Sequence, residues 1–135
     1  MSSSEGSNGA FLKQAASFLG ASGVALGALG AHALQPKLVE RGVVESWRTA
    51  VLYQLFHATT VLGVAALVES SSSSNDPAAT ARLQRAGQYI AVGTTLFSGS
   101  IYLLCFGIGP KKVVGPTTPI GGLVMLSGWV MLGLA

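Results

Sequence analysis

Two histidines, His32 and His57, lie inside long apolar runs of this 135-residue chain, where ionisable side chains are candidates for function. Paired histidines suggest axial haem ligands, which must meet at one depth. At 1.5 Å per residue, helices running in opposite directions would place these two about 10 Å or more apart in depth. We therefore expect neither a haem nor a metal site, and no cofactor.

Polar side chains recur at three- and four-residue spacing around the second histidine: Tyr53, Gln54, His57 and Thr60. This spacing places them on one side of a helix, facing the interior of a bundle, where Ser98 and Ser100 of a later run could meet them. Hydrogen bonding between helices is the favoured interpretation. A proton relay or quinone site at His57 is the alternative, although no Asp or Glu lies inside an apolar run to support a relay.

Catalytic groups are scarce. The five acidic residues all lie outside the apolar runs, and no phosphate-binding loop, dinucleotide-binding turn or nucleophile with a base is recognisable. The single cysteine, Cys105, rules out an internal disulfide and favours a small buried thiol. We expect a protein that is not an enzyme.

Composition indicates a membrane protein. Half of the residues are hydrophobic and 10% are charged, against roughly 25% in soluble domains. The net charge of +3 is spread beside the apolar runs, not clustered, so we do not expect nucleic acid binding.

Four apolar runs, at about 15–34, 49–68, 87–108 and 119–135, each approach the roughly 20 residues that cross a bilayer. They predict an all-α membrane protein, a four-helix bundle forming one domain over 11–135 after a polar tail at 1–10. A serine-rich loop is expected at 69–81. Thr118 followed by Pro119 predicts a capped start of the last helix.

An even number of crossings puts both termini on one side. The loops 35–48 and 109–117 share five cations, against three on the other side, so they are expected to face the cytoplasm or mitochondrial matrix. Residues 38–48 suggest a short interfacial helix with Trp47 at headgroup level. Small residues four apart predict close helix packing: Gly23, Gly27 and Ala31, then Gly87, Ala91, Thr95 and Gly99.

Four motifs cover the predicted spans: GALGAHAL at 27–34, TAVLYQLFHA at 49–58, LFSGSIYLL at 96–104 and TPIGGLVMLSGW at 118–129. Together they resemble the transmembrane protein 256-like family, also called domain of unknown function 423. The resemblance implies a small four-helix membrane protein and no particular activity; the serine-rich stretch looks like an insertion in a eukaryotic member. The matching positions are Gly27, Gly30, His32, Tyr53, Gln54, His57, Ser98, Gly99, Ser100, Pro119, Gly121, Gly122 and Trp129.

The sequence leads us to expect an accessory, structural subunit of a larger membrane complex, such as a respiratory complex of the mitochondrial inner membrane. Another organellar membrane or a bacterial plasma membrane is the alternative location. The expected partners are the bilayer, neighbouring membrane subunits and lipids in helix grooves. A second hypothesis is a carrier or binding protein for a small molecule, lipid or quinone, using the face of Tyr53, Gln54 and His57.

Overall fold

Four long helices and one short helix make up the fold. The computed structural model describes residues 2–73 and 76–135, with side chains from Gly9 onward. The helices are α1 (Ser2–Ala31), α2 (Gln35–Glu40), α3 (Val44–Ser71), α4 (Pro77–Phe106) and α5 (Lys111–Gly133). The part of α1 from Gly9, together with α3, α4 and α5, is long and apolar enough to cross a bilayer. The predicted class, an all-α protein with four spans, is confirmed.

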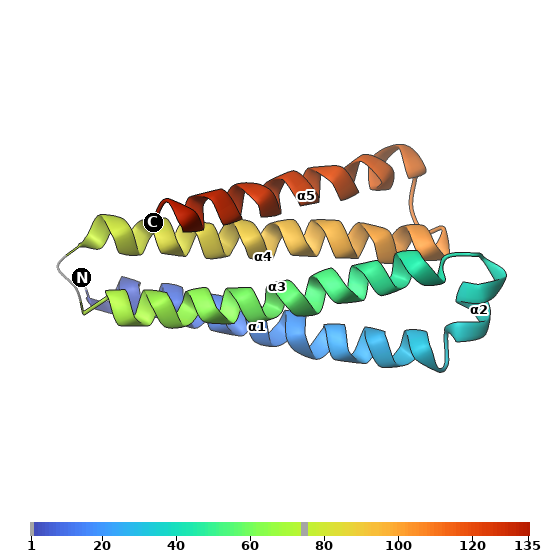
Figure 1. Ribbon diagram of the computed structural model, residues 1–135, viewed down its shortest axis with the longest axis horizontal. Helices are drawn as coiled ribbons and strands as arrows, with labels where there is room; N and C mark the ends of the chain where they lie inside the picture. Colours follow the sequence, from blue (N-terminus) through green and yellow to red (C-terminus); the bar gives the residue numbers. More distant parts are fainter. Residues whose placement is uncertain (1, 74–75) are drawn as a thin grey trace.

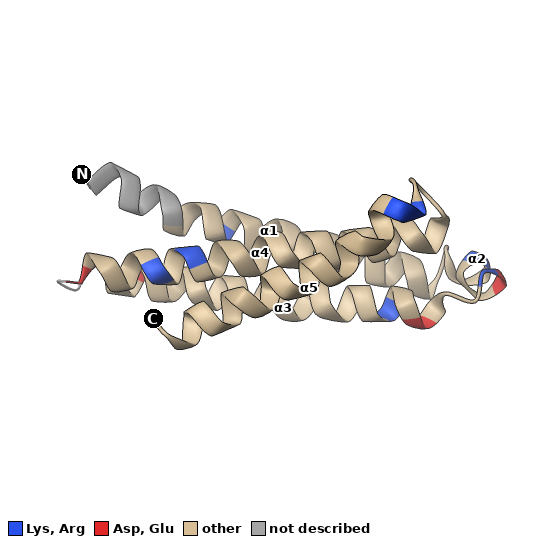
Figure 2. Ribbon diagram, turned by 90° about the horizontal axis from the view of Figure 1, so that it is seen from above, with Lys and Arg blue, Asp and Glu red and all other residues tan. Residues whose placement is uncertain are grey.

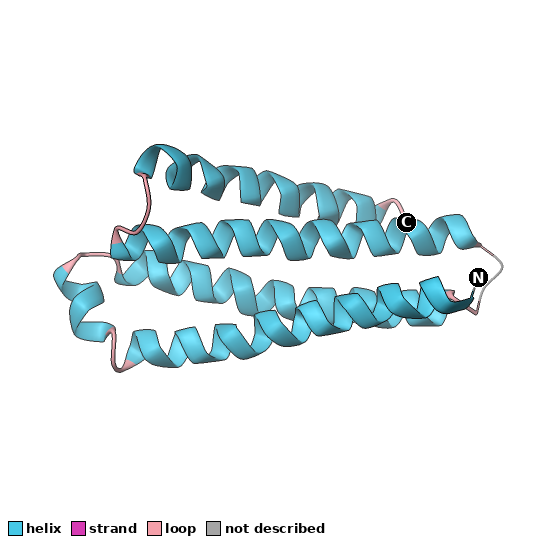
Figure 3. Cartoon of the chain, turned by 180° about the vertical axis from the view of Figure 1, so that it is seen from behind, coloured by secondary structure: helices cyan, strands magenta, loops and turns pink. Residues whose placement is uncertain are grey.

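The long helices run antiparallel to their neighbours in the chain. Helix α1 packs on α3, α3 on α4, and α4 on α5, with α1 and α5 on opposite sides (Figure 1). Both termini lie at one end of the bundle, as predicted, and α2 and the α4–α5 connection lie at the other. The view from behind shows the loops confined to these two ends (Figure 3).

The helices extend beyond the predicted spans. Helix α1 begins at Ser2, within the predicted tail 1–10, and α3 and α4 both continue into the predicted loop 69–81, of which Ser74 and Asn75 lie outside the described residues. The Asp76 carboxylate accepts hydrogen bonds from two backbone amides in the first turn of α4, which starts that helix ten residues before its apolar run. A hydropathy pattern marks the hydrocarbon-facing part of a helix and not its ends.

The start of the last helix is also earlier than predicted. Helix α5 begins at Lys111, not at 119, so Thr118 is no N-cap, and both Pro116 and Pro119 lie inside the helix. Proline is tolerated in membrane helices because neighbouring groups satisfy the freed backbone.

The predicted interfacial helix at 38–48 is divided in the structure. Helix α2 ends at Glu40, and a turn through Gly42, with φ of 66°, leads into α3. Trp47 is 3% exposed and packs with Leu38 and Cys105, so it belongs to the core. The prediction that Trp47 faces the headgroups is therefore wrong.

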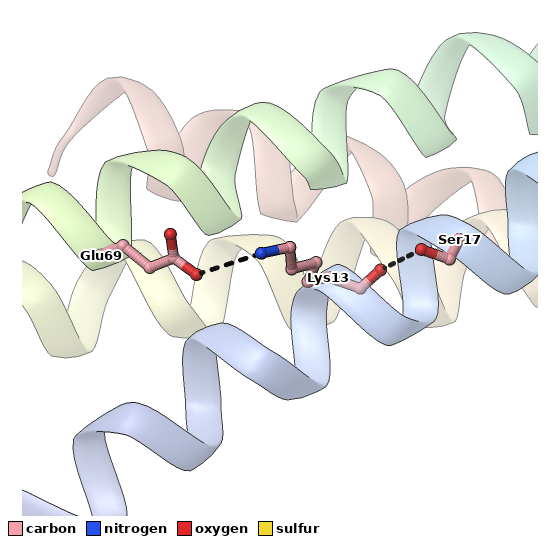
Figure 4. Close-up of polar contacts among 3 residues, drawn as sticks. All are labelled: Lys13, Ser17 and Glu69. Atoms are coloured by element: carbon pink, nitrogen blue, oxygen red, sulfur yellow. Dashed lines mark hydrogen bonds and ion pairs between the residues drawn. The ribbon is translucent and has the colours of Figure 1, made fainter.

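Charged residues lie towards the two ends of the bundle (Figure 2). At the end that holds the termini, the Lys13 Nζ lies 4.0 Å from the Glu69 Oε1, joining α1 to α3 (Figure 4). Both side chains are more than half exposed, so this pair contributes little, roughly 0 to 1 kcal/mol. Packing in the middle of the bundle must therefore hold α1 and α3 together.

Glycines bring the backbones of α4 and α5 into contact. A Cβ added to Gly121 would lie 2.5 Å from the Phe97 backbone nitrogen and 2.9 Å from the Gly93 carbonyl oxygen. One added to Gly128 would lie 2.9 Å from the Ile90 nitrogen. Close approach of this kind drives helix association where lipid offers no hydrophobic gain. The second predicted set of small residues four apart, at 87, 91, 95 and 99, is only partly correct. Gly87 and Ala91 are buried, whereas a Cβ on Gly99 would meet nothing within 4 Å.

Adjacent glycines of α5 provide a matched test of this contact. Gly121→Ala should destabilise the bundle by about 1 to 3 kcal/mol, because helix α4 must move away from the new methyl group. Gly122→Ala should be nearly neutral, since its Cβ would meet only the Phe97 ring at 3.8 Å. Reversible unfolding in mixed micelles, followed by circular dichroism, measures both. Equal stabilities of the two variants would contradict the backbone contact.

Candidate functional site

The side chain of Gln54 joins three helices. Its Nε2 donates to the Leu19 carbonyl oxygen at 2.9 Å and to the Ser22 Oγ at 2.8 Å, both on α1. Its Oε1 accepts from the Tyr102 hydroxyl of α4 at 2.8 Å. Gln54 is 4% exposed, so these bonds satisfy an amide that would be costly to bury alone.

His57 lies one turn further along α3 and links that helix to α5. Its Nδ1 lies 2.7 Å from the Tyr53 carbonyl oxygen, and its Nε2 lies 3.2 Å from the Trp129 Nε1. A carbonyl only accepts and an indole N–H only donates, so the partners assign a neutral ring with its hydrogen on Nδ1. A second ring hydrogen on Nε2 would point at the indole hydrogen. The site therefore favours the neutral imidazole, as expected for a structural histidine.

Tyr53 departs from the predicted inward face. It is 39% exposed, and its ring stacks on the Phe97 ring with centroids 4.6 Å apart and on the His57 ring at 5.7 Å. Thr60 also lies outside the core and donates to the Phe56 carbonyl of its own helix. Only Gln54 and His57 of the predicted polar face are buried.

The two serines of α4 bond to different neighbours. Ser98 is buried and donates from its Oγ to the Ala50 carbonyl oxygen of α3 at 2.8 Å. Ser100 donates to the Phe97 carbonyl, and its Oγ lies 2.6 Å from the Thr118 Oγ1 of α5. Ser98 thus supports the α3–α4 contact and Ser100 the α4–α5 contact, so neither contacts the Gln54 amide.

The glycines of the first motif make room for α3. A Cβ on Gly27 would lie 3.2 Å from Val51, and one on Gly30 would overlap the Trp47 indole, whose Nε1 donates to the Leu26 carbonyl oxygen at 3.0 Å. Glycine is needed at position 30 for α1 to lie this close to α3, whereas a methyl group at position 27 would require only a small shift of Val51.

The remaining predicted residues lie apart from this network. His32 is exposed beyond the end of α1, and Pro119 is exposed on α5. Within residues 2–73 and 76–135, no three His, Cys, Asp or Glu side chains gather as metal ligands would. Gly121 belongs to the α4–α5 contact, whereas Gly122 makes only ordinary contact with Phe97.

Sequence reasoning missed Tyr102, which belongs to the network, and Arg41, which makes a separate contact with the end of α4. Tyr102 lies within the LFSGSIYLL motif at 96–104, but its spacing does not identify Gln54 as its hydrogen-bond partner. The Arg41 Nε donates to the Cys105 carbonyl oxygen at 2.6 Å, so this cation caps the C-terminus of α4. The sequence signal for this helix end was the glycine at 107. In the structure Gly107 has a φ of 66° and ends α4 beside Arg41.

A hollow of about 280 Å³ lies on the surface of α3, lined by Leu52, Tyr53, Phe56 and His57. It is apolar and open, and Gln54 does not line it. The predicted ligand-binding face therefore consists of aromatic rings, and the amide that would recognise a polar ligand is bonded elsewhere.

Gln54 offers a direct test of the network. Gln54→Leu should destabilise the bundle by about 2 kcal/mol, since three interhelical bonds are lost at an average of about 0.6 kcal/mol each in membranes. Thr59→Val is the control, because that hydroxyl bonds only to the Leu55 carbonyl of its own helix. Unfolding in mixed micelles measures both variants, and a Gln54→Leu protein as stable as the control would contradict this role.

Comparison with known proteins identifies relatives along most of the chain. A family model described as protein of unknown function DUF423 matches residues 26–122. A UPF0382 membrane protein of Schizosaccharomyces pombe is 36% identical over 87% of this chain and 93% of its own length. No solved structure matches the chain.

Bacterial relatives are similar over nearly as much of the chain. The UPF0382 membrane protein YwdK of Bacillus subtilis is 33% identical over 83% of this chain and 84% of its own length. The UPF0382 inner membrane protein YgdD of Escherichia coli is 34% identical over 81% of this chain and 76% of its own length. The four spans, the matched residues 26–122 and these relatives together show that the chain is an integral membrane protein belonging to the DUF423 family.

Proposed function

We propose that the protein is a non-catalytic accessory subunit that stabilises a larger membrane assembly, namely a respiratory complex of the mitochondrial inner membrane. The observation that carries this proposal is how the polar groups inside the bundle are used. Among the described side chains, no buried nitrogen or oxygen lacks a hydrogen-bond partner. The buried polar groups are used in hydrogen bonds within the bundle, so contacts with other subunits would be made by the outer surfaces of the helices.

The outer faces of α1 and α5 suit contact with other membrane helices. Phe18 on α1 is 72% exposed, and Leu123 on α5 is 64% exposed. These two helices flank the bundle and contact α3 and α4 on one side only. The name of the Escherichia coli relative places that protein in an inner membrane. Bacterial inner membranes and mitochondrial inner membranes both hold respiratory complexes, which is consistent with this location.

A second candidate function is favoured by the hollow at Tyr53, Phe56 and His57. An apolar ring system such as a quinone or a lipid tail would pack against these aromatic rings. This alternative makes His57 a ligand contact, whereas the accessory-subunit proposal makes it a structural residue.

Native electrophoresis after gentle detergent extraction tests the accessory role. We expect the protein to migrate with a respiratory complex, well above its own 13.7 kDa. A photo-crosslinking residue at Phe18 or Leu123 should then capture a neighbouring subunit. The same residue at Val61, which is fully buried, is the control and should capture none. Migration only as a free small species, with the respiratory complexes intact, would overturn the proposal.

Substitution of His57 separates the two candidate functions. Gln keeps a donor and an acceptor, so His57→Gln should assemble normally, whereas His57→Leu should weaken packing by about 0.6 to 2 kcal/mol. Membrane abundance, incorporation into the complex and respiration are measured for both variants. A ligand role predicts instead that the Gln variant assembles fully but loses respiration as completely as the Leu variant.

A further inference from the structure

A second recess lies at the α2 end of the bundle, between α3 and α5 and above α4. It measures about 360 Å³ and is open along one side. Ile101 and Leu104 of α4 form an apolar floor, Ser46 and Thr49 line the α3 wall, and Gly115 and Thr118 line the α5 wall. The recess is separate from the hollow at Tyr53 and His57, and no step of the proposed function uses it.

The Ser46 and Thr49 hydroxyls in this recess differ from most serine and threonine hydroxyls of the bundle in their hydrogen bonding. Thr59, Thr60 and Thr94 donate to the carbonyl four residues earlier in their own helices, as hydroxyls in helices commonly do. Ser46 and Thr49 make no such bond, nor any other hydrogen bond to the described part of the chain. Their hydroxyl groups remain available to donate to a ligand in the recess.

The α5 wall keeps the recess open and provides an acceptor. A Cβ on Gly115 would meet nothing within 4 Å, so the recess extends to the backbone there. Pro119 has no backbone N–H, and therefore the usual helical donor to the Gly115 carbonyl oxygen is missing. Thr118 is occupied by its contact with Ser100 and contributes mainly to the shape of the wall.

A cation, Lys111, lies one helical turn before Gly115 on α5. Lys111, Gly115 and Thr118 follow the spacing i, i+4 and i+7, which places them on one face of α5. The ion pairs among the described side chains are Lys13 with Glu69 and Arg48 with Glu45, so the Lys111 ammonium group is not paired with a carboxylate.

The whole α2 end of the protein is positive. Residues 35–48 and 109–117 carry five cations and two carboxylates, whereas the opposite end carries three of each. The net charge of +3 thus falls entirely at the end where this recess opens. A ligand that carries negative charge is favoured there over a neutral or zwitterionic one.

We propose that this recess binds the phosphate and glycerol region of an anionic glycerophospholipid. The Lys111 ammonium group neutralises the phosphate, and the Ser46 and Thr49 hydroxyls donate to phosphate or ester oxygens. The Gly115 carbonyl accepts from a headgroup hydroxyl, and the first methylenes of an acyl chain pack on Ile101 and Leu104. A lipid suits the position, because the recess combines an apolar floor with polar walls at the end of a membrane span.

Native mass spectrometry of the purified full chain tests this site. The protein is mixed in detergent micelles with phosphatidylglycerol or with phosphatidylcholine, and retained lipid is counted. We expect phosphatidylglycerol to be retained in preference. Lys111→Gln should lower its retention by about fivefold, the effect of losing one cation near a lipid phosphate. Gly115→Leu, whose side chain fills open space, should abolish the preference without disturbing the fold.

Matched variants control for charge and bulk. Lys112→Gln removes the same charge from the neighbouring residue, which lies further round α5 from Thr118 than Lys111 does. Gly63→Leu adds the same side chain at another glycine with no atom within 4 Å. Both should retain phosphatidylglycerol within about twofold of the unmodified protein. Equal retention of the two lipids, or equal loss in Lys111→Gln and Lys112→Gln, would overturn the proposal. Displacement of the lipid by millimolar inorganic phosphate would also overturn it, in favour of a site for soluble anions.

Discussion

The structure depends on one constraint: inside a bilayer, each buried polar group must find its partner within the protein. Gln54 shows how the bundle meets it. A single amide donates twice to α1 and accepts once from α4, so that satisfying its hydrogen bonds fixes three helices relative to one another. His57 adds the fourth helix through Trp129. The hydrogen bonds that remove the cost of burying these groups also set the arrangement of the helices.

The helix pairs differ in how much of their contact is packing and how much is hydrogen bonding. The α4–α5 contact is mainly one of backbone against backbone, made possible by Gly93, Gly121 and Gly128. The α1–α3 contact combines glycines with the Trp47 indole and the Gln54 amide. Since lipid tails are as apolar as leucine, neither contact gains from excluding water, and both depend on close fit and on directional bonds.

The two ends of the molecule have different characters. At the end holding the termini, cations and carboxylates balance, and among the side chains described from Gly9 onward the ion pair between helices there, Lys13 with Glu69, is exposed. At the other end, positive charge is in excess, and Arg41 is drawn in to cap the carbonyls of α4. The placement of loops 35–48 and 109–117 on the cytoplasmic or matrix side is a prediction from this same charge difference. The excess of positive charge also gives the recess between α3 and α5 its electrostatic character.

The sequence by itself determined the class of protein and the number of spans, because transfer into lipid depends on the composition of each run and little on its neighbours. Of the polar side chains expected to face inward on α3, Gln54 and His57 are buried and Tyr53 and Thr60 are not. Helix ends were misjudged at Asp76 and Lys111, since capping and tolerated prolines act outside the hydropathy signal. Only the tertiary structure decided which partner each polar side chain takes and which glycines contact a backbone. Those outcomes depend on how each helix is rotated against the next, and spacing along one helix carries no information about the rotation of another.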